Sequence, residues 1–280
     1  MKQKRRIWSE YKEQIKTNKL TFAVYVILRA LVIVAMVFSC IRGDYENLFF
    51  CALSLVLFLV PAFIEKNFGI DLPCALEIVV LLFIFAAEIL GEMESYYLKV
   101  SYWDDMLHTI NGFLCAALGF ALVDILNRNE NIKFQLSPLF LAIVAFCFSM
   151  TIGVFWEFFE ILCDIILKLD MQKDTFVSTI SSTLLGDGTN TAVVIDNITS
   201  VIVNGQEIGT NGYLDIGLYD TMKDLFVNFI GAFVFCIIGF FYVKNRGKGV
   251  FANQFIPKLM HKSYNSAENG DNSKDKSKEF

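Results

Sequence analysis

The sequence carries little charge for its length. Only 19% of its 280 residues are Asp, Glu, Lys or Arg, whereas soluble domains carry about 25%. Hydrophobic residues make up 55% of the chain, and the mean hydropathy is +0.51. Several apolar runs are long enough to cross a bilayer. The composition therefore excludes an ordinary soluble domain and predicts a helical protein that crosses a membrane several times.

Several signatures of other protein classes are also missing. No basic stripe with interleaved aromatic residues is present, so we expect no nucleic-acid partner. The seven cysteines occur singly in apolar stretches without a CxxC pair, and are interpreted as packing residues. No phosphate-cradling glycine loop, redox motif, HExxH motif or Ser-His-Asp arrangement is visible. The motifs thus exclude several familiar enzyme classes and name none.

Six apolar segments of roughly 20 residues each are long enough to span a bilayer as helices. They predict an all-α membrane protein with about six transmembrane helices in residues 20–243. Residues 1–19 are expected to form a cytoplasmic segment, and residues 244–280 a cytoplasmic tail with a disordered end. The predicted spans are approximately 20–41, 47–64, 73–90, 104–126, 137–167 and 221–243.

Lysine and arginine in the short flanks predict the orientation. Basic residues are frequent in the flanks before the first span and after the last one, and they also occur between the fourth and fifth spans. Because cytoplasmic flanks carry an excess of these residues, we expect both termini to be cytoplasmic. The segment between the third and fourth spans then lies outside, and it carries Glu92 and Glu94.

A polar external loop of about residues 168–218 is predicted before the last span. It is rich in Thr, Asn and Gly. Two β-rich stretches, 192–195 and 200–203, lie next to an Asn-Gly pair at 204–205, a pattern typical of short strands with a tight turn. We therefore expect a small β-rich loop outside the membrane.

Three short polar stretches lie at the edges of apolar runs, where ionisable residues are functional candidates. The alternating direction of the spans places all three at the outer end of their helices. Helical periodicity gives each stretch one polar face. Their members are Asp104, His108 and Asn111 in the fourth span, Glu157, Glu160 and Asp164 in the fifth, and Asp220, Asp224 and Asn228 in the sixth.

Carboxylates with one imidazole suit a divalent cation such as Mg²⁺, Mn²⁺ or Zn²⁺. His108 and Glu157 are also candidate catalytic groups, because an imidazole beside a carboxylate can move protons. Ordinary roles stay open for each residue, as a hydrogen-bonding partner between helices or a charge at a helix end. The candidate metal ligands are Asp104, His108, Glu157, Glu160, Asp220 and Asp224, and Asp164, Asn228 and Asn111 are further polar candidates.

These motifs resemble the YjdF-like family of bacterial inner-membrane proteins, and more widely the VanZ-like membrane proteins. The resemblance implies the bacterial cytoplasmic membrane and a role at the cell envelope. It implies no reaction, because the family has none established. VanZ-like relatives are associated with reduced susceptibility to a glycopeptide antibiotic. The residues that carry the resemblance are Trp103, Asp104, His108 and Gly112, then Glu157 and Glu160, then Asp220, Thr221, Asp224, Asn228 and Gly231.

Three functions are compatible with these features. In the first, an outer acidic pocket with one histidine binds a cation together with a lipid or envelope headgroup, with or without hydrolytic or transfer chemistry. In the second, the carboxylates belong to a proton- or cation-coupled transporter. In the third, they join the helices of a non-catalytic scaffold. The bilayer is the one partner common to all three, and the choice between enzyme and non-enzyme stays open.

Overall fold

The computed structural model describes residues 19–127, 136–208, 211–245 and 252–259. Within these residues, six helices are long and apolar enough to cross a membrane, which confirms the predicted all-α membrane fold. Two of the six are built from consecutive helical pieces, and the short helix α6 (Tyr96–Lys99) lies between the third and fourth. The six are α2 (Lys19–Arg42), α3–α4 (Tyr45–Leu57 and Val60–Phe68), α5–η1 (Cys74–Phe85 and Ala86–Met93), α7 (Trp103–Asn127), α8 (Pro138–Leu167) and α9 (Leu218–Lys244).

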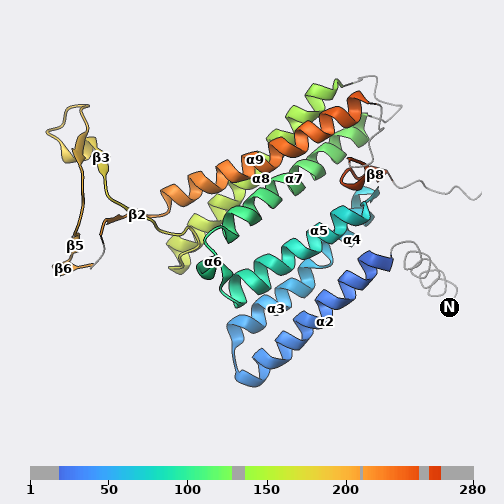
Figure 1. The fold of residues 1–280 in the computed structure, drawn as a ribbon, viewed down its shortest axis with the longest axis horizontal. Coiled ribbons are helices and arrows are strands. Elements are labelled where there is room, and N and C mark those ends of the chain that lie inside the picture. The colour runs from blue at the N-terminus through green and yellow to red at the C-terminus, as the bar shows by residue number, and fades with distance from the viewer. Residues whose placement is uncertain (1–18, 128–135, 209–210, 246–251, 260–280) are drawn as a thin grey trace, which may run out of the picture.

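The helices form two bundles (Figure 1). Helices α7, α8 and α9 pack against one another, and α2, α3 and α5 pack together beside them. Each bundle has its own hydrophobic core. Phe120 and Phe235 fill the core of the first bundle, whereas Val32 and Phe58 lie in the core of the second.

Apolar side chains also cover the outer surfaces of the bundles. Ile143 on α8 and Phe233 on α9 are both about half exposed. In water such a surface would be costly, but in a bilayer the hydrocarbon chains cover it. The outward-facing apolar residues are therefore the lipid-facing part of the protein.

Small residues let α7 and α9 approach closely. A Cβ atom added to Gly231 on α9 would overlap the carbonyl oxygen of Thr109 on α7. A Cβ atom added to Gly112 on α7 would overlap the carbonyl oxygen of Asn228 on α9. Glycines at membrane helix contacts allow backbones to touch in this way. The contact of α7 with α9 thus depends on two reciprocal glycines.

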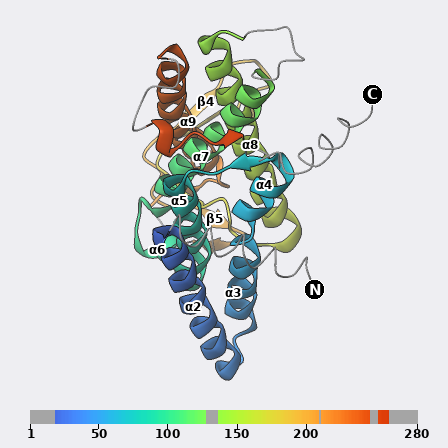
Figure 2. The same cartoon turned by 90° about the vertical axis from the view of Figure 1, so that its right-hand side faces the viewer.

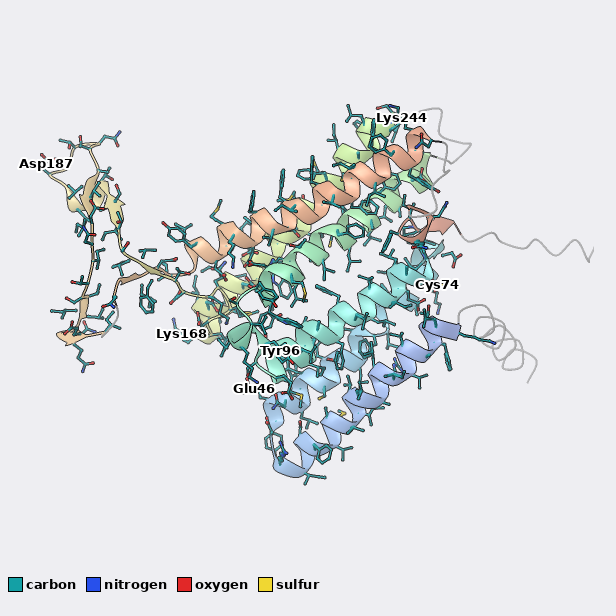
Figure 3. The ribbon with its side chains drawn as sticks, viewed as in Figure 1. Glu46, Cys74, Tyr96, Lys168, Asp187 and Lys244 are labelled. Atoms are coloured by element: carbon teal, nitrogen blue, oxygen red, sulfur yellow. The ribbon has the colours of Figure 1, made fainter. Side chains whose placement is uncertain are left out.

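The two ends of the bundles are distinguished in Figure 3. Tyr96 and Lys168 lie at one end, which we call the loop end because the segment between α8 and α9 leaves the bundle there. We call this segment the external segment because it lies outside the helical bundle. Cys74 and Lys244 lie at the opposite end. Helices α7 and α9 begin at the loop end, and α8 ends there.

The segment between α8 and α9 contains short strands, as the sequence predicted. Three two-stranded sheets form a thin arm that projects from the loop end (Figure 1), with Asp187 near its far end (Figure 3). Both predicted stretches are strands, but they do not pair with each other, and the Asn-Gly turn joins β5 to β6. The pairs are β2 (Phe176–Val177) with β7 (Tyr213–Leu214), β3 (Ile180–Ser182) with β4 (Val193–Ile195), and β5 (Ile202–Val203) with β6 (Gln206–Glu207).

The chain after α9 packs against the bundles at the end opposite the loop end. Strand β8 (Lys258–Leu259) pairs with β1 (Ile70–Asp71), and Figure 2 shows this short sheet beside α4. Ile256 is buried, and the ring of Phe255 lies 5.4 Å from that of Phe113 on α7. Part of the predicted tail therefore packs on the protein. The predicted N-terminal segment up to residue 18, and the tail at 246–251 and 260–280, lie outside the described residues.

Candidate functional site

Helices α7, α8 and α9 bring five ionisable side chains together at the loop end. Asp104 and His108 are one turn apart on α7, Glu157 and Glu160 are neighbours on one face of α8, and Asp224 lies on the second turn of α9. Because three helices contribute, this group, which we call the carboxylate cluster, depends on tertiary packing rather than on local sequence.

The imidazole of His108 is surrounded by carboxylates. Its Nε2 lies 3.6 Å from Asp104 Oδ1 and 3.9 Å from Asp224 Oδ2. Its Nδ1 lies 3.8 Å from Glu157 Oε1. All three separations exceed the 2.7–3.2 Å typical of a hydrogen bond from nitrogen to oxygen. His108 is thus positioned between three acidic groups without being bonded to any of them.

Several carboxylate oxygens of the cluster are buried without a hydrogen-bond partner among the described residues. They are both oxygens of Glu157, both oxygens of Asp224 and Oε2 of Glu160. The exposed fractions of these residues are only 3%, 1% and 6%. Buried polar groups in proteins are nearly always paired, because an unpaired one costs free energy. The cluster therefore has the chemistry of a site whose ligand would supply the missing contacts.

Two sets of possible metal ligands can be drawn from these side chains. Asp104, His108 and Asp224 offer atoms within 4.8 Å of one another, and so do Glu157, Glu160 and Asp224. The carboxylate of Asp224 belongs to both sets. A carboxylate and imidazole donor set of this kind fits a divalent cation.

Lysines lie around the cluster at the loop end. Lys223 Nζ on α9 lies 2.8 Å from Asp105 Oδ1 on α7, and the Lys223 side chain is half exposed. Lys173, in the segment after α8, lies within electrostatic range of Asp104 and Glu92. The acidic centre is therefore bordered by positive charge.

Asp164 fixes the segment that follows α8. Its Oδ1 accepts a hydrogen bond from the backbone N–H of Met171 at 2.7 Å, and its Oδ2 accepts one from Gln172 at 2.9 Å. These bonds pull the chain back over the last turns of α8. Gln172 is consequently buried, and its side chain lies close to Glu157.

The start of α9 fixes the same segment from the other side. Asp220 Oδ2 accepts a hydrogen bond from the backbone N–H of Lys173 at 2.8 Å. The side-chain amide of Gln172 donates to Thr221 Oγ1 at 2.5 Å. The two ends of the external arm, where it leaves α8 and where it enters α9, are thus hydrogen-bonded to each other above the cluster. Gln172 covers the cluster on the side of the loop end.

A second polar layer lies beneath the cluster. Asn111 Nδ2 on α7 donates to Asn228 Oδ1 on α9 at 3.3 Å, and Asn228 Nδ2 approaches Met150 Sδ on α8 at 3.6 Å. Gly153 on α8 leaves the space that the Asn228 amide occupies. Hydrogen bonds of this kind join helices in membranes. These asparagines hold the three helices together directly below the carboxylates.

On the side of the other bundle, η1 and α6 lie beside the carboxylate cluster. The indole of Trp103 donates from Nε1 to the carbonyl oxygen of Ala86 at 3.3 Å, which joins α7 to η1. Tyr97 on α6 packs against Gly91 of η1. Burial, with help from the carboxylates of Asp104 and Glu92, raises the pKa of the Tyr97 phenol. The phenol therefore keeps its proton. The neighbouring segment η1 is a π-helix, a form frequent at functional sites.

Of the candidate ligands from the sequence, the structure brings five together: Asp104, His108, Glu157, Glu160 and Asp224. Asp220 and Asp164 instead accept backbone hydrogen bonds from the external segment, and Asn111 and Asn228 form the layer beneath. Whether any of the five holds a metal stays a prediction.

Sequence reasoning missed Gln172, Lys173 and Tyr97. Gln172 and Lys173 lie in an irregular segment without periodicity, so their approach to the cluster depends on loop geometry. Tyr97 occupies a four-residue helix between two spans and resembles an interfacial aromatic residue. Gln172 is recognised as part of the site because it is a polar side chain buried in a loop. This burial is visible only in the fold.

The fold and cluster define a polytopic helical membrane protein with a buried acidic group between its helices. The chain belongs to the family described as "Predicted membrane protein (DUF2238)", whose model matches residues 24–245. The match covers every member of the carboxylate cluster and all six spans apart from residues 19–23 of the first. No curated protein and no solved structure matches the chain.

Proposed function

We propose that this protein binds a divalent cation at the carboxylate cluster, and that the bound cation holds the anionic headgroup of a lipid or lipid-linked envelope molecule. The observation that carries the proposal is the set of buried, unpartnered oxygens on Glu157, Glu160 and Asp224. A cation would pair with these oxygens and remove the cost of burying them.

The position of the cluster supports a headgroup as the ligand. It lies near the ends of α7, α8 and α9, where the apolar spans meet the polar external segment. In the orientation that the basic flanks predict, this end faces outward, in the bacterial inner membrane that the YjdF-like and VanZ-like resemblance implies. Lys223 and Lys173 border the acidic centre and suit an anionic group bound to the cation.

The structure offers less support for transport. The segment of α7 between His108 and Asp124 contains Ala116, Ala117 and Phe120, which are fully buried in the apolar core. Among the described residues, this stretch of α7 has no Asp, Glu, His, Lys or Arg side chain that would continue a polar path. The cluster thus resembles a site at one end of the protein rather than part of a channel through it.

Cation binding is tested on the full chain in detergent, stripped with EDTA and titrated with MnCl₂ by calorimetry. We expect binding to the wild type and to Asp105→Asn, because Asp105 is paired with Lys223 outside the cluster. Glu157→Gln should weaken binding at least tenfold. Equal affinity in the wild type and Glu157→Gln would contradict the proposed cation site.

The headgroup is tested with the Mn²⁺-loaded protein and a matched pair of short-chain lipids. Dioctanoyl phosphatidic acid has an anionic phosphate, whereas dioctanoylglycerol has the same chains without it. We expect the phosphatidic acid to bind at least tenfold more tightly, and only in the presence of the cation. Similar affinities for the two lipids, or no effect of EDTA, would reject an anionic headgroup as the ligand.

A further inference from the structure

Asp224 occupies the centre of the carboxylate cluster. It is the only residue common to both sets of possible ligands, and it is the most deeply buried of the five, with 1% of its surface exposed. Both of its oxygens lack a hydrogen-bond partner among the described residues. A carboxylate with two free oxygens between two ligand sets has the arrangement of a bridging ligand.

We propose that the cluster holds two divalent cations bridged by the Asp224 carboxylate. Asp104 and His108 complete the first position, and Glu157 and Glu160 complete the second. The inference rests on the proposed function, since it takes cation binding as given. It adds the number of ions, the ligands of each and the role of Asp224.

The distances around His108 favour the first position. Two atoms that each lie about 2.1 Å from one ion are at most about 4.2 Å apart. His108 Nε2 lies 3.6 Å from Asp104 Oδ1 and 3.9 Å from Asp224 Oδ2. These separations are too long for hydrogen bonds and suitable for three ligands around one ion. The other ring nitrogen, Nδ1, faces Glu157, so the two positions are also linked through His108.

The contacts of Glu160 favour the second position. Its Oε1 accepts a hydrogen bond from Trp156 Nε1 at 2.7 Å, which orients the carboxylate, while Oε2 has no partner among the described residues. Both oxygens of Glu157 lack one as well. One oriented and one unpaired carboxylate therefore lie within 4.8 Å of a carboxylate oxygen of Asp224.

Charge balance favours two ions over one. The four carboxylates of the cluster carry four negative charges when ionised, and a neutral imidazole adds none. One divalent cation would leave two negative charges buried, which is costly at a membrane helix. Two divalent cations neutralise all four. Lys223 does not change this count, because it pairs with Asp105.

A pair of bridged cations narrows the ligand class. Ions about 3.5–4 Å apart in two-metal sites hold two oxygens of one phosphate group. The ligand most suited to this cluster is therefore a phosphate ester, as in a phospholipid or a lipid-linked phosphate. A neutral sugar headgroup carries no anionic oxygens to bind both ions.

The number of ions is measured on the full-length protein in detergent after EDTA treatment and dialysis against MnCl₂. We expect two Mn²⁺ per chain by elemental analysis, with an electron paramagnetic resonance spectrum of an exchange-coupled pair. Asp104→Asn and Glu160→Gln should each retain one uncoupled ion, whereas the matched control Asp105→Asn keeps two. Asp224→Asn should lose the coupling and most of the metal.

Each result separates this inference from the proposed function. One ion in the wild type overturns the pair and leaves a single cation site. Two ions without exchange coupling overturn the bridging role of Asp224. The absence of bound Mn²⁺ overturns both proposals. Since the wild-type protein alone gives these answers, a variant that fails to fold does not affect them.

Discussion

His108 on α7 faces Asp224 on α9 across the interface of the two helices, with Nε2 and Oδ2 separated by 3.9 Å. The approach is possible because the same helices touch one turn further on, where Gly112 meets the carbonyl oxygen of Asn228. The position of the acidic group therefore depends on the close approach of the two helices. Variants can separate the two contributions.

Glu157→Gln should stabilise the protein in EDTA and should reduce the stabilisation that a cation provides. In EDTA, removing an unpaired buried charge should raise the melting temperature, by an amount corresponding to about 1–3 kcal/mol. With Mn²⁺ at 100 times the dissociation constant of the wild type, a site adds about 2.7 kcal/mol to the wild type, and a variant that binds tenfold more weakly should keep only about half of that gain. Thermal unfolding in detergent measures both. A lower melting temperature for Glu157→Gln in EDTA would favour the scaffold interpretation.

Gly231→Ala should destabilise the contact of α7 with α9. The new Cβ would overlap the carbonyl oxygen of Thr109, and a backbone atom cannot move aside as a flexible side chain can. Overpacking of this kind costs about 1–3 kcal/mol. The matched control is Gly186→Ala in the external arm, where a Cβ makes only ordinary contacts of 3.4–3.5 Å. Equal melting temperatures for the two variants would show that the helices tolerate separation.

Asp164→Ala should release the segment that covers the cluster. The substitution removes both acceptors of the Met171 and Gln172 amides, which are bonded at 2.7 and 2.9 Å. Hydrogen exchange at these two amides should accelerate at least tenfold. Asp170→Ala is the control, because Asp170 contributes its backbone carbonyl to the Lys173 contact rather than its side chain. Unchanged protection of Gln172 would mean that Asp220 alone holds the segment.

Ile256→Ala should destabilise the protein although Ile256 lies beyond the last span. The side chain is 1% exposed and belongs to the core of the α7–α9 bundle. Truncation of a buried isoleucine costs about 2–5 kcal/mol. Gln254→Ala, at an exposed position of the same segment, should leave the melting temperature unchanged. If Ile256→Ala behaves in the same way, the segment does not contribute to the core.

The spans were predictable because each depends on a local run of apolar residues of sufficient length. The meeting of His108 with Glu157 was predictable too, since the alternating direction of consecutive spans brings their positions to the same end. Asp164 and Asp220 were harder to interpret. Their sequence context is that of the cluster, and only the path of the chain at Met171 and Lys173 shows that they accept backbone hydrogen bonds.

The return of the chain after α9 was not predictable. Phe255 and Ile256 form a short apolar stretch among polar residues, without a periodic pattern that would indicate burial. Their positions depend on β8 pairing with β1, residues that are nearly 190 positions apart in the sequence. Contacts of such long range carry no local signal. The same limitation applies to Tyr97, whose burial depends on η1.

Asp224 lies on α9, the last of the six spans in the described residues. Since the chain is synthesised from its N-terminus, the first five helices can enter the membrane before α9 exists. Until then His108 and Glu157 lack the nearby Asp224 carboxylate, and the backbone of Thr109 on α7 lacks its contact with Gly231. The acidic group can therefore assemble only after synthesis of α9, so a chain that ends before α9 lacks Asp224 altogether.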